Sequence, residues 1–387
     1  MSKINISDAV RYIGCDDHDI DLFESQYHVP NGVSYNSYLI VDEKIAIMDT
    51  VDARATEGWF ANMEQELAGR KPDYLVVSHL EPDHASNIQK VCEKYPDLQV
   101  VGNAKTFGML PQFFTLDFSG RKMEVKEGDT LELGSHSLTF YMAPMVHWPE
   151  VMVAYENQEK ILFSADGFGK FGTLDTQEDW DDEARRYFIN IVGKYGMPVQ
   201  TLLKKAAALD MQTICPLHGP VLKENLAYYL EKYQVWSSYR PEEEGVVIVY
   251  ASIHGNTAAA AGKLAALLEE KGQKVSVFDL ARDDMAKAVA DAFRYDRLVL
   301  AAATYDGGLF PCMEDFLYHL KMKNYQKRTI GIMENGSWAP MAAKLMKEYA
   351  ESFKDCVLAE PVVTIRSTLN AASQAQLEQL AEALETQ

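Results

Sequence analysis

Apolar, β-branched runs alternate with helix-periodic segments along the last part of the chain. Such runs are typical of strands that are buried on both faces. The expected strands are 246–250, 275–278, 298–302, 329–333 and 357–364. The expected helices, rich in Ala, Leu and Lys, lie near 257–271, 284–294, 312–322, 339–353 and 371–384. This alternation predicts a doubly wound α/β unit with a parallel five-stranded sheet, which binds its ligand at the carboxyl ends of the strands.

The first part of the chain has a different pattern. Pairs of apolar runs flank polar turns, which predicts β-hairpins over 34–49 and 152–164. A strand is expected at 74–78, and helices are expected near 54–67, 85–95, 182–195 and 198–209. This is an α+β mixture, and periodicity alone does not give its topology.

A short charged stretch at 239–245, bounded by Pro and Gly, separates the two patterns and is typical of a linker. We therefore expect two domains, residues 1–242 and 243–387. The length of 387 residues and the ordinary content of 47% hydrophobic and 24% charged residues agree with two globular domains.

Charge and cysteine content narrow the class of protein. The formal net charge of −20 argues against a basic nucleic-acid-binding surface. No apolar run approaches the length of a membrane span, about 18 residues or more, and the N-terminus has no signal-peptide pattern. The five cysteines are far apart and never form a CxxC pair, which argues against disulfides, a zinc ribbon and a four-cysteine iron site. We expect a soluble, cytoplasmic protein.

Metal-ligating side chains are concentrated in the loop after the expected strand at 74–78. Residues 79–84 hold two imidazoles and two carboxylates. A helix cap by Asp83 beside surface histidines would give the same loop, so the loop alone does not decide. Further candidates also lie at strand ends or in loops. The candidate metal ligands are His79, Glu81, Asp83, His84, His147, Asp166 and His218.

This set resembles the metallo-β-lactamase superfamily motif, with one departure. The hydrolases of that superfamily have a second histidine where this chain has Glu81. A carboxylate shifts the ligand set toward hard oxygen, which suits iron better than zinc. Three carboxylates bring −3 against +4 for two divalent metals, and one bridging hydroxide would bring the site near neutrality. We expect a dinuclear centre that Asp166 bridges.

The chain resembles the flavodiiron proteins over almost its whole length. The resemblance is carried by the carboxylate at position 81, the opening segment 30–38 and the stretches 147–149 and 218–220. The resemblance implies an N-terminal metallo-β-lactamase-like αββα domain. It implies one iron bound by His79, Glu81 and His147, and another bound by Asp83 and His218. Asp166 would bridge them, and His84 is a variable partner in this family. By the same analogy, Tyr195 is a candidate for contact with the site.

The second domain carries small and hydroxylated residues at 252–257, where the first strand turns into a helix. Backbone N–H groups and hydroxyls at such a turn can surround a phosphate, although an ordinary helix cap would use the same residues. The stretch is neither a Walker A loop nor a GxGxxG turn. With the loops at 303–308 and 334–338, this half resembles a flavodoxin, which implies FMN. The implied FMN-binding residues are Ser252, His254, Gly255, Asn256, Thr257, Thr304, Tyr305, Asp306, Gly307, Gly336 and Trp338.

The two resemblances together imply an oxidoreductase that passes electrons from FMN to a non-haem diiron centre. It would reduce O2 to water, NO to N2O, or both, and so protect an anaerobic metabolism. They also imply a head-to-tail homodimer or a dimer of dimers, and an external electron donor such as rubredoxin, a flavoprotein reductase or a reduced deazaflavin coenzyme. Two alternatives stay open: a zinc-dependent hydrolase with an accessory flavodoxin domain, and a non-catalytic flavodoxin-like carrier on an inactive scaffold. The sequence does not choose between O2 and NO.

Overall fold

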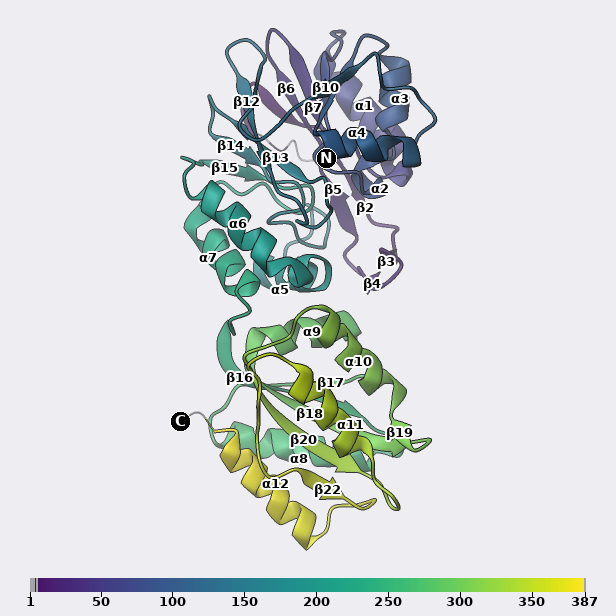
Figure 1. Ribbon diagram of the computed structural model, residues 1–387, viewed down its shortest axis with the longest axis vertical. Coiled ribbons are helices and arrows are strands. Elements are labelled where there is room, and N and C mark those ends of the chain that lie inside the picture. The colour runs from purple at the N-terminus through teal and green to yellow at the C-terminus, as the bar shows by residue number, and fades with distance from the viewer. Residues whose placement is uncertain (1–3, 5, 386–387) are drawn as a thin grey trace. The chain divides into compact units, whose positions relative to one another are not determined.

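The computed structural model describes residue 4 and residues 6–385, and it forms two compact units (Figure 1). The first unit runs to Phe188 and includes Met197–Tyr233, and the second comprises Ile189–Gly196 and the chain from Gln234 onward. The division therefore falls inside helix α7 (Leu226–Ser237), which the sequence pattern did not predict. The domain boundary at 242/243 stays a prediction.

Two β-sheets form the centre of the first unit. The first has the order β1-β6-β7-β8-β9-β10, and the second has the order β11-β12-β13-β14-β15. Strands of the first sheet are β1 (Val10–Tyr12), β6 (Tyr38–Val41), β7 (Ile45–Met48), β8 (Tyr74–Val76), β9 (Gln99–Gly102) and β10 (Lys122–Glu124). Strands of the second are β11 (Thr130–Glu132), β12 (Ser137–Met142), β13 (Met152–Glu156), β14 (Ile161–Phe163) and β15 (Thr213–Cys215). The expected hairpins at β6–β7 and β13–β14 are present.

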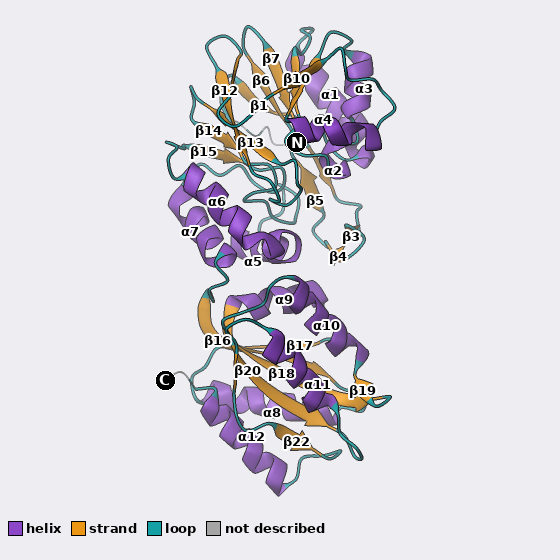
Figure 2. Ribbon diagram, viewed as in Figure 1, coloured by secondary structure: helices purple, strands orange, loops and turns teal. Residues whose placement is uncertain are grey.

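The two sheets share one apolar core. Ile40 and Met48 from the first sheet and Phe140, Ala154 and Phe163 from the second belong to the same buried cluster. Helices lie outside the sheets, as in an αββα sandwich (Figure 2). They are α1 (Thr56–Leu67), α2 (Pro82–Ala85), α3 (Ile88–Lys94), α4 (Ala104–Met109), α5 (Trp180–Tyr187), α6 (Gly196–Ala206) and α7. Two small ribbons, β2 (Cys15–Asp17) with β5 (Val33–Tyr35) and β3 (Leu22–Phe23) with β4 (Tyr27–His28), complete the unit.

The second unit is the expected doubly wound α/β fold. Its sheet has the order β17-β16-β18-β20, with β21 and β22 both paired to β20. The strands are β16 (Glu243–Ala251), β17 (Val275–Asp279), β18 (Tyr295–Tyr305), β20 (Thr329–Asn335), β21 (Val357–Leu358) and β22 (Val363–Ile365). These six are parallel, and only the short β19 (Gly308–Leu309) pairs antiparallel, with β18. Helices α8 (Asn256–Glu270) and α12 (Ala371–Ala383) pack together on one side, whereas α10 (Pro311–Met322) contacts both α9 (Met285–Arg294) and α11 (Ala342–Ser352).

The fifth strand differs from the prediction. The sequence pattern predicts one strand over 357–364, but the structure has two short strands there, β21 and β22. Pro361 lies between them and has no N–H group to donate to the sheet, so the strand is interrupted. None of the helices that the structure describes is both long enough and apolar enough to span a bilayer.

A histidine joins the turns of the two sheets in the first unit. His136 Nδ1 lies 2.7 Å from Asp42 Oδ2, in the β6–β7 turn, and His136 Nε2 lies 3.2 Å from Glu159 Oε1, in the β13–β14 turn. Burial alone would lower the pKa of His136, but the contacts with Asp42 and Glu159 outweigh burial and raise that pKa. The charged ring therefore stabilises the contact between the turns.

We predict that this contribution depends on pH in a defined direction. Because the folded-state pKa of His136 is raised, the stabilisation is complete below the unfolded pKa of about 6.5 and is lost as the pH rises through the folded value. His136→Gln should lower the free energy of unfolding of the first unit in urea by about 1 kcal/mol at low pH and by less at high pH. His28→Gln, at an exposed histidine, is the control. A difference that stays constant or grows with pH would contradict the assignment.

Candidate functional site

The candidate metal ligands lie at the ends of four strands of the first unit, in loops and in the short helix α2. Strands β12 and β14 are both antiparallel to β13, and β15 is parallel to β14, so these three strands end at the same edge of their sheet. The loop after β8 belongs to the other sheet. His79 and Glu81 follow β8, Asp83 and His84 lie in α2, His147 follows β12, Asp166 follows β14, and His218 follows β15.

Backbone strain accompanies two of these loops. Met145, two residues before His147, has a φ of 67°, and Ala165, directly before Asp166, has a φ of 51°. Left-handed backbone at a non-glycine residue costs about 1–3 kcal/mol and persists only where the surroundings hold it in place. The fold therefore stabilises these loops in the shape that brings His147 and Asp166 to the cluster.

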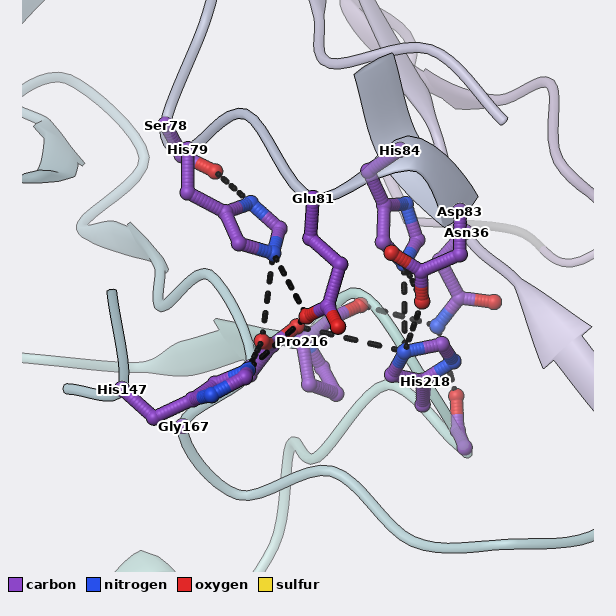
Figure 3. Close-up of polar contacts among 12 residues, drawn as sticks. Asn36, Ser78, His79, Glu81, Asp83, His84, His147, Gly167, Pro216 and His218 are labelled. Carbon is purple, nitrogen blue, oxygen red and sulfur yellow. Dashed lines mark hydrogen bonds and ion pairs between the residues drawn. The ribbon is translucent and has the colours of Figure 1, made fainter. Parts of the chain in front are cut away.

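Four side chains converge in a first group (Figure 3). His147 Nε2 lies 2.9 Å from Glu81 Oε2 and 3.1 Å from Asp166 Oδ2. His79 Nε2 lies 3.2 Å from Asp166 Oδ2 and 3.8 Å from Glu81 Oε2. Two imidazole nitrogens and two carboxylates thus face one small space.

A second group consists of Asp83, His84 and His218. His218 Nε2 lies 3.1 Å from Asp83 Oδ2 and 3.2 Å from His84 Nε2 (Figure 3). Asp166 also faces this group, because its Oδ1 lies 3.9 Å from His218 Nε2 while its Oδ2 faces the first group. One carboxylate therefore addresses both groups with different oxygens, which is the arrangement expected of a bridge.

Backbone carbonyls orient the two imidazoles of the second group. His84 Nδ1 lies 3.3 Å from the carbonyl of Thr50, and His218 Nδ1 lies 2.8 Å from the carbonyl of Ser34. A carbonyl oxygen accepts only, so each Nδ1 carries a proton and each Nε2 is turned toward the cluster. The two Nε2 atoms lie 3.2 Å apart, which places them so that one cation can bind both. The geometry fits a metal ion.

The unpaired atoms of the cluster support the same conclusion. Among the described residues, His79 Nε2, His147 Nε2 and both carboxylate oxygens of Asp83 and of Asp166 are buried and make no hydrogen bond of good geometry, and their close polar contacts are the histidine–carboxylate ion pairs within the cluster. Each such atom costs about 1–3 kcal/mol in a folded protein unless another interaction replaces its lost water. Metal coordination satisfies all of them, and imidazole with carboxylate suits iron.

Charges within the cluster shift the pKa values of its members. Burial alone would lower the pKa of His79, but the carboxylates of Asp166, Asp83 and Glu81 outweigh it and raise that pKa to about 10. Burial lowers the pKa of His84 to about 4, so this ring is neutral at neutral pH. A metal ion that binds here displaces a proton from His79 but meets a free lone pair on His84.

The opening segment 30–38 supports the loop that carries His218. Asn36 Nδ2 donates to the carbonyls of Pro216 and Gly219, each at 2.8 Å, and Tyr38 Oη donates to the Pro216 carbonyl at 2.6 Å. Gly219 has a φ of 76°, and a Cβ there would lie 2.6 Å from Cγ of Lys170. Only glycine fits this turn, which explains the stretch 218–220 without a direct role for Gly219 at the metals.

Aromatic rings surround His218. The rings of Phe23, Tyr35 and Tyr187 lie 5.4, 6.1 and 5.4 Å from its centroid. Tyr187 is buried, and this burial together with the nearby carboxylates raises the pKa of its phenol well above its ordinary value. Sequence reasoning selected Tyr195 instead, but Tyr195 lies in the segment 189–196 of the second unit. Its contact with the site stays a prediction.

The second unit has a cavity of about 520 Å³ at the carboxyl ends of β16, β18, β20 and β22. Nine of the expected flavin-binding residues line it: Ser252, His254, Asn256, Thr257, Thr304, Asp306, Gly307, Gly336 and Trp338. The other two expected residues, Tyr305 and Gly255, are not in the lining of this cavity. Tyr305 lines a neighbouring pocket, and Gly255 lies at the turn into α8, where its φ is 87°. The lining includes no Lys or Arg, so a phosphate here would rely on N–H and hydroxyl donors.

Two features of this cavity were not predicted. Ser367, in the loop after β22, also lines it, and its hydroxyl lies 2.5 Å from that of Ser337. The position of Ser367 after the last strand was the available signal. Thr304 Oγ1 accepts hydrogen bonds from the N–H groups of Met341 and Ala342, at 2.9 and 3.1 Å, and so caps the start of α11.

Comparisons with known proteins agree with both halves. Residues 33–219 match a family described as ODP family beta lactamase, and residues 247–363 match a flavodoxin domain family. A nitric oxide reductase of Moorella thermoacetica is 31% identical over 385 residues, covering 94% of this chain and 93% of that protein.

The chain belongs to the flavodiiron protein family.

Other similar proteins agree with this membership. An anaerobic nitric oxide reductase flavorubredoxin of Aliivibrio salmonicida is 27% identical and matches 87% of this chain and 69% of its own length. The fold is shared with the rubredoxin oxygen:oxidoreductase of Desulfovibrio gigas, with a TM-score of 0.92, 24% identity and coverage of 99% of this chain and 97% of that chain. It is also shared with the flavodiiron protein of Giardia intestinalis, with a TM-score of 0.93, 22% identity and the same coverage. The two relatives in sequence favour a flavodiiron oxidoreductase over the zinc hydrolase.

We predict that Thr304→Val weakens FMN binding. The variant keeps the side-chain shape but removes the acceptor of the N–H groups of Met341 and Ala342 at the start of α11, and loss of such a cap costs about 1 kcal/mol. The Kd for FMN, from quenching of flavin fluorescence on titration of the flavin-free protein, should rise about fivefold. Thr329→Val, at the opposite end of β20, should leave the Kd unchanged. An unchanged Kd in the Thr304 variant would contradict the role of the cap.

Proposed function

We propose that the two groups of side chains in the first unit hold the two irons of this flavodiiron oxidoreductase. One iron takes His79, Glu81 and His147, the other takes Asp83, His84 and His218, and Asp166 bridges them. The observation that carries this assignment is the convergence of metal-ligating nitrogen and oxygen atoms, several of which are buried and make no hydrogen bond. The orientation of His84 Nε2 toward His218 Nε2 favours His84 as a ligand.

We propose that the cavity of the second unit binds FMN. When bound, FMN and iron would supply the electrons that reduce O2 to water, with four electrons, or two NO to N2O, with two electrons. The names of similar proteins support both substrates, as a nitric oxide reductase and a rubredoxin oxygen:oxidoreductase.

The chain's own residues prepare the site for this chemistry. The rings of Phe23, Tyr35 and Tyr187 form an apolar wall at His218, which limits access of water to the metal ligands. Because its pKa is raised, the Tyr187 phenol keeps its proton on Oη at neutral pH. Solvent supplies the protons that either reduction consumes.

The partners are a further part of the proposal. An external donor fits this chain, which has no four-cysteine iron module, and a rubredoxin is supported by the name of the Desulfovibrio protein. A flavoprotein reductase and a reduced deazaflavin coenzyme are alternative donors. Since rubredoxins are commonly acidic and this chain has a net charge of −20, docking would use a local basic or apolar patch. A head-to-tail homodimer, alone or paired, and a cytoplasmic location stay predictions.

We predict that Asp83→Ala abolishes consumption of O2 and of NO while FMN stays bound. The variant removes a carboxylate of the second group and leaves His84 and His218 without their anion. Metal analysis should show loss of iron, and the flavin absorbance should be retained. Asp117→Ala, at an exposed carboxylate of the same unit, is the control. Undiminished gas consumption by the Asp83 variant would refute the metal assignment.

The preferred gas can be measured with the intact protein. Anaerobic stopped-flow of the photoreduced protein, mixed with O2 or with NO, compares the two rates of reoxidation directly. A faster reaction with one gas identifies the preferred substrate, whereas reoxidation by neither would refute the proposed activity.

A further inference from the structure

Glu150 is a buried carboxylate outside the ligand set. It lies in the loop between His147 and β13, and only 1% of its surface is exposed. Its Oε1 accepts a hydrogen bond from the backbone N–H of Leu80 at 2.8 Å. Because Leu80 separates His79 from Glu81, this carboxylate holds the peptide that connects two candidate ligands of the first group.

Further contacts fix the loop that carries Glu150. Asn103 Nδ2 donates to the carbonyl of Glu150 at 2.6 Å, and the N–H of Met152 donates to the carbonyl of Ser78 at 3.0 Å. The loop that carries His79 and Glu81 is therefore bound, at Ser78 and at Leu80, to the segment that follows His147. Three of the four members of the first group depend on these two loops.

The second oxygen of Glu150 has no such partner. Oε2 is buried and lacks a hydrogen bond among the described residues, and no ion pair of the described part of the chain includes Glu150. A buried carboxylate without compensation is costly. Metal ions held by the ligands that its loop positions would supply a balancing positive charge.

A carboxylate that only caps a loop looks different in this protein. Glu156, at the far end of β13, is also fully buried. Its two oxygens accept the N–H groups of Gln158 and Glu159, at 3.0 and 2.5 Å, so neither is left unpaired. Glu156, in β13, is therefore a suitable control for Glu150, in the loop before β13: both carboxylates are buried, but only Glu150 has an oxygen without a hydrogen bond.

We propose that Glu150 is a positioning residue for the first iron and adds a negative charge beside the diiron centre to those of the ligands Glu81, Asp83 and Asp166. The same charge favours the more positive, oxidised irons, so it lowers the midpoint potential of the centre. This inference rests on the proposed function.

Two substitutions separate the charge of Glu150 from its hydrogen bond. Glu150→Gln keeps an oxygen for the N–H of Leu80 but removes the charge, so the diiron midpoint potential should shift upward while iron retention stays near the wild-type value. Glu150→Ala removes both, and iron affinity should fall about tenfold or more. Glu156→Gln should change neither quantity. All three are measured on the full-length holoprotein, by redox titration followed by EPR and by iron release to a chelator.

The outcomes are distinguishable. An unshifted diiron potential in Glu150→Gln overturns the charge role, and unchanged iron release in Glu150→Ala overturns the positioning role. An equal change in Glu156→Gln overturns both, because any buried carboxylate of this region would then suffice. The FMN potential should stay constant in every variant. A wild-type protein that binds no iron refutes the proposed function and this role with it, whereas iron-loaded wild type with unaltered variants refutes only the role of Glu150.

Discussion

The first unit buries many charged groups and lone pairs close together, and its structure depends on how these groups are stabilised. Three carboxylates and four imidazoles meet at the end of a sandwich whose two sheets share one apolar core. Desolvation penalises every one of these groups, and protein hydrogen bonds satisfy only part of them. Divalent cations are the partners that satisfy the rest, so the metal-binding chemistry follows from the packing of the loops.

The fold supplies that packing through supports distant in the sequence. The opening segment holds the loop of His218 through Asn36 and Tyr38, while the carbonyls of Ser34 and Thr50 orient two imidazoles. The strained backbone before Asp166 is maintained by the same framework. Ligand geometry is thus a property of both sheets together, whereas the flavin cavity of the second unit needs only loops at one edge of one sheet.

Local sequence patterns predicted the features of the fold and of the site that depend on residues close together in the sequence. The strand followed by His79, Glu81, Asp83 and His84 is one such pattern, and the alternation of strands and helices in the second unit is another. No local pattern singled out Glu150, because its hydrogen-bond partner, the N–H of Leu80, is 70 residues away in the sequence. Tyr187 and Tyr195 both fall in an expected helix over 182–195, but a π-helical turn at 188–192 changes the direction of the side chains after it. Periodicity of a regular helix could not distinguish them.

The most direct test of the central claim is the identity and number of metal ions between these loops. Anomalous difference maps from crystals of the native protein, recorded on both sides of the iron absorption edge, would measure both. The account predicts two iron peaks in each chain, one beside each group of ligands and both adjacent to Asp166. A single peak, or two peaks that appear at the zinc edge and not at the iron edge, would contradict it.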